Sequence, residues 1–232
     1  MTEFKHHWNI MTFHREKWWK PWANTLVYYN INDNDTSTTI YDLSWNNNNL
    51  SWTTITYWTD ATVWKVFTAW RPSSSIINFG NEFTFISWAY YTAATGCIFS
   101  NGAWASSFAS NSLFAWYNTN KMTGFVWGNT TNPAKWIISQ SDIPTNQWVM
   151  YAYTRDSSWN LKIYLNATLD NTTTIATNPV YPSWTTFMFW WWWGWGNDMN
   201  GKIKTLIWEN RTWTADEIAK YYNQTKSKYW IS

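Results

Sequence analysis

The sequence predicts an all-β protein built as a two-sheet antiparallel sandwich with one short C-terminal helix. Short runs rich in aromatic and β-branched residues alternate with clusters of Asn, Ser, Thr and Gly, which is the pattern of strands joined by turns. The run that starts at Asn160 also alternates cleanly, with Leu161, Ile163 and Leu165 on one side. We expect that run to be a half-buried strand.

The candidate strands follow one another along most of the chain. Each is short and is bounded by turn-forming residues. They are residues 26–31, 75–79, 82–91, 97–100, 112–117, 123–126, 135–139, 147–154, 160–169, 185–189 and 201–207.

The sequence predicts one helix near the C-terminus. Thr214 and Glu217 have the spacing of a capping box, in which each residue satisfies a backbone N–H group of the other. Ile218, Tyr221 and Tyr222 then fall on one face. We expect this helix to pack on an edge of the sandwich.

The domain organisation that we predict is a single sandwich over residues 24–224. Residues 1–23 fit neither the strand pattern nor the helix pattern, so we interpret them as an N-terminal tail or linker. Residues 225–232 are expected to form a loose C-terminal tail.

Composition excludes several functional classes. The chain has 232 residues, of which 45% are hydrophobic and 13% charged, so it can bury one sizeable core. Its formal net charge is only +2 and the charges are spread out, which argues against a nucleic-acid partner. No apolar stretch is long enough to span a bilayer, and no signal-like segment is seen at the start, so we expect no membrane insertion.

The tryptophan and glycine contents are both abnormal. The chain has 25 Trp and 8 Gly, whereas a chain of this length at ordinary usage holds about 16 glycines. Trp45 lies among Ser and Asn, and Trp159 ends a hairpin loop, where a left-handed residue is normally required. The run of residues 190–195, followed by Gly196, reads more naturally as a polyglycine turn than as five indoles in six positions.

We therefore hypothesise that most of these tryptophans are glycines. The gene would use UGA for glycine, as some bacterial lineages and their viruses do. Trp88 and Trp148 lie inside apolar strands and are expected to be genuine and buried, while Trp213 is undecided. For the suspect positions we expect exposed turns or positive φ, and we assign no sugar-stacking role to Trp45, Trp104, Trp127 or the Trp190–Trp195 cluster. The alternative is a genuinely Trp-rich protein with a sugar-stacking surface.

Read with glycine at the doubtful positions, five segments in order carry a family resemblance. They are residues 24–52, with an Asp-x-Ser-(Trp/Gly)-Asn turn; residues 64–70; residues 83–91, which include Trp88; the hairpin of residues 147–169; and residues 190–224, with a Gly-Lys-Ile strand, an Asn-Arg pair and the terminal helix. Over roughly residues 24–224 the chain resembles LamG-like jelly-roll domains of the concanavalin A-like lectin/glucanase superfamily.

The resemblance implies a jelly roll, and the superfamily contains glycan-binding lectins, adhesive modules, glycosidases and viral structural domains. It also implies an extracellular, cell-surface or virion setting, although the location itself stays unknown. A glycosidase of this fold needs two carboxylates a few ångströms apart, usually delivered by one strand. The sequence has no Glu-x-Asp-x-Glu pattern, and the pair Asp216–Glu217 is explained by the helix dipole, so we name no catalytic residue and expect no enzyme.

A bound metal is a weaker expectation. The three histidines all lie in the N-terminal tail, which excludes a histidine zinc site inside the sandwich. Asp33 and Asp35 flank Asn34 in one loop and are the candidate calcium ligands, although Asp and Asn also populate turns for purely structural reasons. No other cofactor is expected.

Three functions from different classes are open. We favour a non-catalytic binding module that recognises a glycan or cell-surface protein through loops at one rim. The alternative is a structural or adhesive domain of a virion or surface assembly, with no specific sugar binding and as part of a larger assembly. The least favoured is a glycoside hydrolase, because the paired acids are missing.

Overall fold

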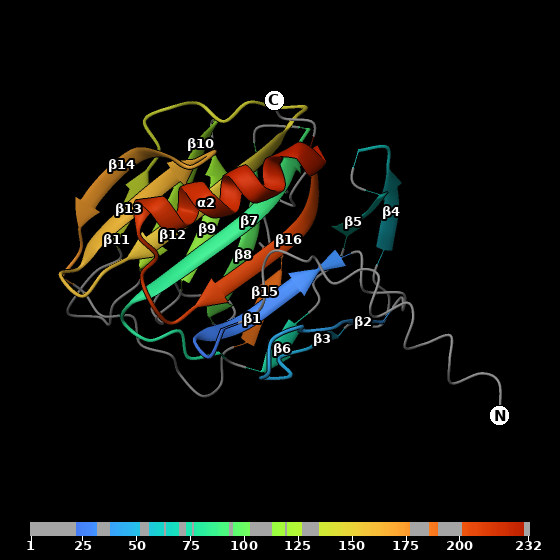
Figure 1. The fold of residues 1–232 in the computed structure, drawn as a ribbon, viewed down its shortest axis with the longest axis horizontal. Coiled ribbons are helices and arrows are strands. Elements are labelled where there is room, and N and C mark those ends of the chain that lie inside the picture. Colours follow the sequence, from blue (N-terminus) through green and yellow to red (C-terminus); the bar gives the residue numbers. More distant parts are fainter. Residues whose placement is uncertain are drawn as a thin grey trace.

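A computed structural model of the chain describes two packed β-sheets and a C-terminal helix (Figure 1). The described residues are 22–31, 38–51, 56–62, 64–69, 73–75, 77–92, 95–102, 113–118, 120–126, 135–176, 186–189 and 201–229. Every strand pairing within them is antiparallel. The all-β fold class and the single C-terminal helix are therefore as predicted.

The first sheet has the strand order β14-β13-β12-β7-β16-β5-β4, and β1 pairs with β16 beside this path. Its longest strands, β7 and β16, lie next to each other at its centre. The bounds are β1 Thr25–Asn30, β4 Thr56–Asp60, β5 Trp64–Ala69, β7 Phe83–Tyr91, β12 Trp148–Arg155, β13 Asn160–Leu165, β14 Thr168–Thr174 and β16 Gly201–Glu209.

The second sheet has the order β11-β10-β9-β8-β15-β6-β3-β2. Its two edge strands are both short: β2 has two residues and β11 has four. The bounds are β2 Thr39–Ile40, β3 Leu50–Ser51, β6 Ser73–Ser75, β8 Thr95–Gly102, β9 Leu113–Asn118, β10 Lys121–Val126, β11 Lys135–Ile138 and β15 Thr186–Phe189.

The main core lies between the two sheets. It joins inward side chains of the first sheet, such as Phe85 and Tyr153, to Met122 and Ile137 of the second. The close approach of the sheets explains Gly124 in β10, because a Cβ atom there would lie 2.6 Å from the Tyr153 ring. Gly124 is required for this spacing, since any side chain would push the sheets apart.

The outer face of the first sheet is also buried, because the helix α2 (Ala215–Thr225) lies across it. Figure 1 shows α2 crossing in front of β12, β7 and β16. Ile218 and Tyr221 pack with Trp88 and Ile207 of the sheet in a second buried cluster. The expected capping box of Thr214 and Glu217 is confirmed. The expected position on a sandwich edge was wrong, since the strands carry apolar residues on both faces and the helix covers the outer one.

The C-terminal boundary also differs from the loose tail expected at residues 225–232. The chain continues from α2 into a 3₁₀ helix, Lys226–Tyr229. The Tyr229 ring stacks on Trp88 at 3.9 Å between ring centroids, and Thr225 accepts a hydrogen bond from the Trp88 indole. Residues 225–229 are therefore part of the packed sandwich, because an aromatic side chain in them completes the outer cluster.

The segment 160–169 was expected to be one strand and is a hairpin instead. Strand β13 ends at Leu165, and Asn166 and Ala167 both adopt positive φ, which is the geometry of a two-residue turn. The Asn166 side chain accepts a hydrogen bond from the Met150 N–H group, which fixes the turn on β12. The alternating pattern continues across this turn, which is why it looked uninterrupted in the sequence.

The Asn-rich segment after β2 is a turn held together by its own side chains. The Asp42 carboxylate is buried and accepts hydrogen bonds from the backbone of Tyr28, Ser44 and Asn48. The Asn46 side chain donates to the Thr25 carbonyl oxygen at 2.8 Å. The motif thus ties the turn to β1, which is a structural role.

The tryptophans with described side chains fit the expectation only in part, because Trp208 is fully buried and Trp136 is exposed in a regular strand and not in a turn. Trp88 and Trp148 are buried, as predicted, and Trp213 is buried as well. Trp45 lies in a turn with 80% of its surface exposed, and Trp159 has a φ of +64°. The side chains of Trp104, Trp127 and the Trp190–Trp195 cluster lie outside the described residues. No helix among the residues described is long and apolar enough to cross a membrane.

Candidate functional site

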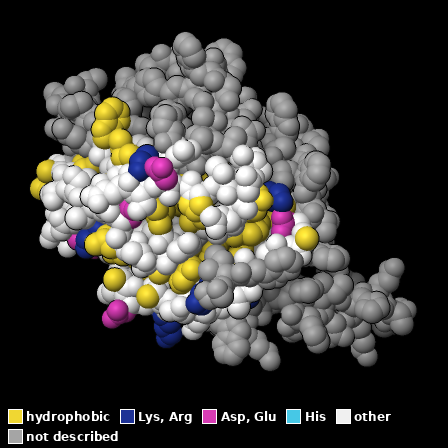
Figure 2. Space-filling model, turned by 90° about the horizontal axis from the view of Figure 1, so that it is seen from above, with side chains coloured by type: hydrophobic (Ala, Val, Ile, Leu, Met, Phe, Trp, Pro, Cys, Tyr) yellow, Lys and Arg dark blue, Asp and Glu magenta, His cyan; other side chains and the backbone are white. Residues whose placement is uncertain are grey.

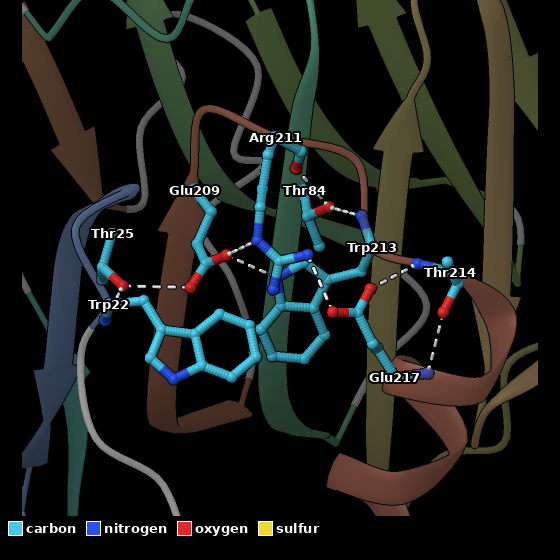
Figure 3. A network of polar contacts seen from close by, with 8 residues as sticks. All are labelled: Trp22, Thr25, Thr84, Glu209, Arg211, Trp213, Thr214 and Glu217. Carbon is cyan, nitrogen blue, oxygen red and sulfur yellow. Dashed lines mark hydrogen bonds and ion pairs between the residues drawn. The ribbon is translucent and has the colours of Figure 1, made fainter.

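A network of polar and charged side chains lies where β16 ends and α2 begins (Figure 3). Glu209, the last residue of β16, has no exposed surface. Its carboxylate accepts hydrogen bonds from the Thr25 hydroxyl at 3.0 Å and the Trp213 indole at 2.6 Å, and it pairs with Arg211 Nε at 2.9 Å. Three groups from different elements therefore converge on this one carboxylate.

Arg211 extends the network to the helix and to the residues that precede β1. Its Nη1 atom pairs with the Glu217 carboxylate at 2.8 Å, while Glu217 also caps α2. The guanidinium lies against two neighbouring indoles, 4.4 Å from the ring centroid of Trp22 and 5.5 Å from that of Trp213 (Figure 3). Planar stacking and forked hydrogen bonds are the interactions for which arginine is suited.

This network has a structural role and is not a catalytic pair. The oxygens of Glu209 are already bound by neighbouring side chains, and the group is sealed from solvent, so no substrate can reach it. Glu82, the other acid next to β7, is exposed. Sequence reasoning missed the network, although Glu209, Arg211 and Glu217 lie within nine residues of one another and in the Asn-Arg segment of the family resemblance.

Two charged groups of the sandwich have lowered pKa values. Burial alone would raise the pKa of Glu217, but hydrogen bonds from Thr214 and the Arg211 charge outweigh it and lower the pKa. Burial would also raise the pKa of Asp156. Hydrogen bonds from Asn160 and Ser158 and the Lys162 charge outweigh this effect and lower the pKa. Both carboxylates are therefore stabilised in their ionised form.

These shifts predict loss of stability in acid. A carboxyl group with a lowered folded-state pKa stabilises the fold above its unfolded-state pKa, about 4, and loses this contribution as the pH falls through the folded-state value. Urea unfolding should therefore give an unfolding free energy that is steady between about pH 7 and 5 and falls below about pH 4. The decline should be shallower in Glu217→Gln. An identical decline in that variant would contradict the assignment for Glu217.

The candidate metal ligands cannot be placed. Asp33 and Asp35 belong to residues 32–37, which lie outside the described residues, as do the three histidines. Within the part of the chain that is described, no three His, Cys, Asp or Glu side chains come together as a metal site would require. A calcium site at Asp33 and Asp35 stays a prediction.

An exposed apolar strip lies on the outward face of the second sheet, at strands β10 and β11. Ile137 points into the core between the sheets, so its neighbours Trp136 and Ile138 point outward. The exposed fractions of these two side chains are 61% and 44%. In register, Ile138 pairs with Thr123 of β10 and Trp136 pairs with Phe125. This strip, formed by Trp136 and Ile138, is called the β11 face below.

Polar groups flank the β11 face. Lys121, at the start of β10, forms an ion pair with Asp142 at 2.7 Å and donates to the Gln140 carbonyl oxygen. On the face seen in Figure 2, basic and acidic side chains are interspersed among hydrophobic and uncharged atoms, and no continuous block of one sign covers its described part. At the β11 face itself, the exposed apolar side chains are followed by the Lys121–Asp142 ion pair.

The end of β11 is fixed to the first sheet. Asp170 of β14 accepts hydrogen bonds from the N–H groups of Gln140, at 2.5 Å, and Ser141, at 3.0 Å. The Asn171 side chain donates to the Ile138 carbonyl oxygen at 2.7 Å. Asp170 lies at a register shift between β13 and β14, which is the signature of a β-bulge. The bulge holds the β11 face in position.

Comparison with known proteins identifies the family to which this fold belongs. The family model described as concanavalin A-like lectin/glucanases superfamily matches residues 67–219. The chain belongs to this superfamily. The predicted superfamily membership and two-sheet jelly roll are thereby confirmed. No curated protein matches the sequence.

Several solved structures share the superfamily fold. The binding domain of Paraclostridial Mosquitocidal Protein 1 has a TM-score of 0.68 and 15% identity, over 86% of this chain and 52% of that one, so the superfamily domain described here spans about half its length. A second structure is domain 4 of AbnA, a GH43 extracellular arabinanase from Geobacillus stearothermophilus, in complex with arabinotriose. It has a TM-score of 0.64 and 16% identity, and the match covers 84% of this chain and 97% of that one.

A third structure is more distant. The CBM40 of the Ruminococcus gnavus IT-sialidase, bound to α2,3-sialyllactose, has a TM-score of 0.54 and 11% identity, over 61% of this chain and 82% of that one. At such identities the likeness of these superfamily members shows the fold alone.

Proposed function

We propose that this chain is a non-catalytic module that binds a glycan on the β11 face, with help from the adjoining rim loops. The observation that carries the proposal is that Trp136 and Ile138 are exposed next to each other on a sheet face. On the outer face of the other sheet, α2 covers part of the surface and buries Ile218 and Tyr221 there.

The chemistry of the β11 face suits a sugar. A pyranose or furanose ring has an apolar C–H face and a rim of hydroxyl groups. The indole of Trp136 can stack on the apolar face, while Lys121, Asp142 and Gln140 supply charged and polar groups past the C-terminal end of β11, on the far side of Ile138. Because the Asp170 contacts fix the end of β11, this surface is ordered before a ligand arrives.

The fold comparisons support the same class of function. The relatives described above include a carbohydrate-binding module bound to sialyllactose and an arabinanase domain in complex with arabinotriose. Both structures contain a bound oligosaccharide. For the present chain we propose no catalytic residue, because Glu209 is buried within its hydrogen-bond network.

One variant tests the role of the β11 face. Trp136→Ala should weaken glycan binding at least about tenfold, since removing a central aromatic contact removes much of the binding energy. Arabinotriose, α2,3-sialyllactose and a broad glycan array are suitable probes, with affinities measured by calorimetry. Trp45→Ala is the matched control, because it removes an equally large exposed ring from a turn. Equal losses in both variants, or none in Trp136→Ala, would contradict the proposal.

A specific observation favours the alternative of a structural or adhesive domain. Leu169 is half exposed on β14, and β14 is joined to β11 through Asn171 and Ile138. Trp136, Ile138 and Leu169 thus lie on the edge strands of the two sheets, a place where a second copy or another domain can dock. Failure to bind any sugar, together with stable oligomers that Trp136→Ala dissociates, would support this alternative over the glycan module.

A further inference from the structure

The hairpin loop between β12 and β13 is a well-defined turn. The N–H group of Trp159 donates to the Asp156 carbonyl oxygen at 2.9 Å, which closes a four-residue turn over residues 156–159. The Asp156 carboxylate accepts hydrogen bonds from the N–H groups of Ser158 and Asn160. Asp156 N–H in turn donates to the Asn160 carbonyl oxygen at 3.1 Å. This is the hairpin in which a turn is followed by one left-handed residue.

Residue 159 is the left-handed position of this loop. Its φ is +64°, and its carbonyl oxygen accepts a hydrogen bond from Ile175 N–H, so the backbone is held on both sides. In such loops the residue at this position is typically glycine, because a Cβ atom crowds the backbone in the left-handed conformation. A tryptophan there bears this strain, and its ring is 40% exposed.

Elsewhere in the described residues, positive φ is adopted mainly by glycine and asparagine. Besides Trp159, the described residues with positive φ are Gly80, four asparagines and Ala167. Glycine and asparagine are the residues that tolerate this conformation. Trp159 is the aromatic exception among them, whereas Trp88 and Trp213 fill buried sites in which their indoles donate hydrogen bonds.

Trp45 departs from its surroundings in a different way. Its backbone does not have positive φ, but its ring is 80% exposed in a turn whose order comes from Asp42 and the neighbouring asparagines. The ring contributes nothing to the hydrogen bonds that hold this turn. Glycine would serve there equally well.

We propose that residues 159 and 45 are glycine in the native protein, because the gene uses UGA as a glycine codon. Residues 88, 148 and 213 are tryptophan encoded by UGG. Among these five positions the division follows the local structure: tryptophan is native where the indole is buried, and glycine is native where a turn presents the residue to solvent. Trp136, which is exposed but lies in the regular strand β11, falls outside this division and is taken as tryptophan.

Peptide sequencing of the protein from its natural source tests this proposal directly. Trypsin cleaves after Arg155 and Lys162, which isolates residue 159 in a seven-residue peptide. The peptides 136–155 and 212–220 carry Trp148 and Trp213 as internal controls. The expected result is glycine at 159 and tryptophan at 148 and 213, with UGA and UGG at the matching codons. Tryptophan at 159, or glycine at 148 or 213, would overturn the proposal.

A stability measurement on the recombinant chain gives a second test. Trp159→Gly should raise the Tm by about 2–8 °C, since relief of left-handed strain exceeds the small loss of a half-exposed ring. The matched control is Trp136→Gly, in which an exposed tryptophan of an ordinary strand is replaced. That variant should lower the Tm, because glycine weakens a strand. A lower Tm in Trp159→Gly would count against glycine as the native residue at this position.

Discussion

Replacing Trp88 with alanine should lower the free energy of unfolding by about 3–5 kcal/mol, the range for truncating a large buried aromatic side chain. Trp88 is fully buried on the outer face of β7, where Tyr229 stacks on it at 3.9 Å and Tyr222 at 5.8 Å between ring centroids. Its indole also donates a hydrogen bond to Thr225 at 3.1 Å. Urea unfolding followed by circular dichroism measures the loss.

The same variant should release the C-terminal 3₁₀ helix. Lys226 and Lys228 lie in this helix, so trypsin should cut there faster in Trp88→Ala than in the parent chain. Trp45→Ala is the control and should change stability by no more than about 0.5 kcal/mol. A stability change in Trp88→Ala as small as that of the control would show that the outer cluster does not hold α2 to the sheet.

Arg211→Met should cost about 3–5 kcal/mol, because it leaves the Glu209 carboxylate buried without its cationic partner. Glu209 keeps hydrogen bonds from Thr25 and Trp213 in this variant, but two neutral donors do not compensate a buried charge. The exposed contact with Glu217 adds little to the loss, since partly solvated ion pairs contribute about 0–1 kcal/mol. Chemical denaturation at neutral pH provides the measurement.

A double variant separates the charge effect from a loss of packing. In Glu209→Gln/Arg211→Met the buried charge is gone, and the glutamine amide can still accept from Trp213. We expect this double variant to regain a large part of the stability that Arg211→Met loses. If the two variants are equally unstable, the contact of Arg211 with the rings of Trp22 and Trp213 is the dominant contribution, and the charge pair is not.

Local chemistry was readable in the sequence wherever one short segment decides the structure. The capping box of Thr214 and Glu217 involves residues three apart and forms as predicted. The left-handed position at residue 159 follows from the turn residues that precede it. Trp88 and Trp148 were expected to be buried because their strand neighbours are apolar, and both are.

The errors in the sequence interpretation arose where one pattern fits two structures. The alternation from residue 160 to 169 continues across a two-residue turn, so one strand and a tight hairpin look alike. The position of α2 depended on which sheet face was apolar, and β7 is buried on both faces. The packing of Tyr229 on Trp88 joins residues far apart in the chain, a contact that no local pattern encodes.

The sequence by itself determined the fold class, the superfamily resemblance, the helix cap and the burial of Trp88 and Trp148, because each depends on residue types within one segment or on their order. Only the tertiary structure decided that α2 covers the first sheet, that Glu209 is enclosed by Arg211, Thr25 and Trp213, and that Trp136 and Ile138 face outward from β11. These features depend on pairing register and on which of two sheet faces is covered, and long-range packing sets both.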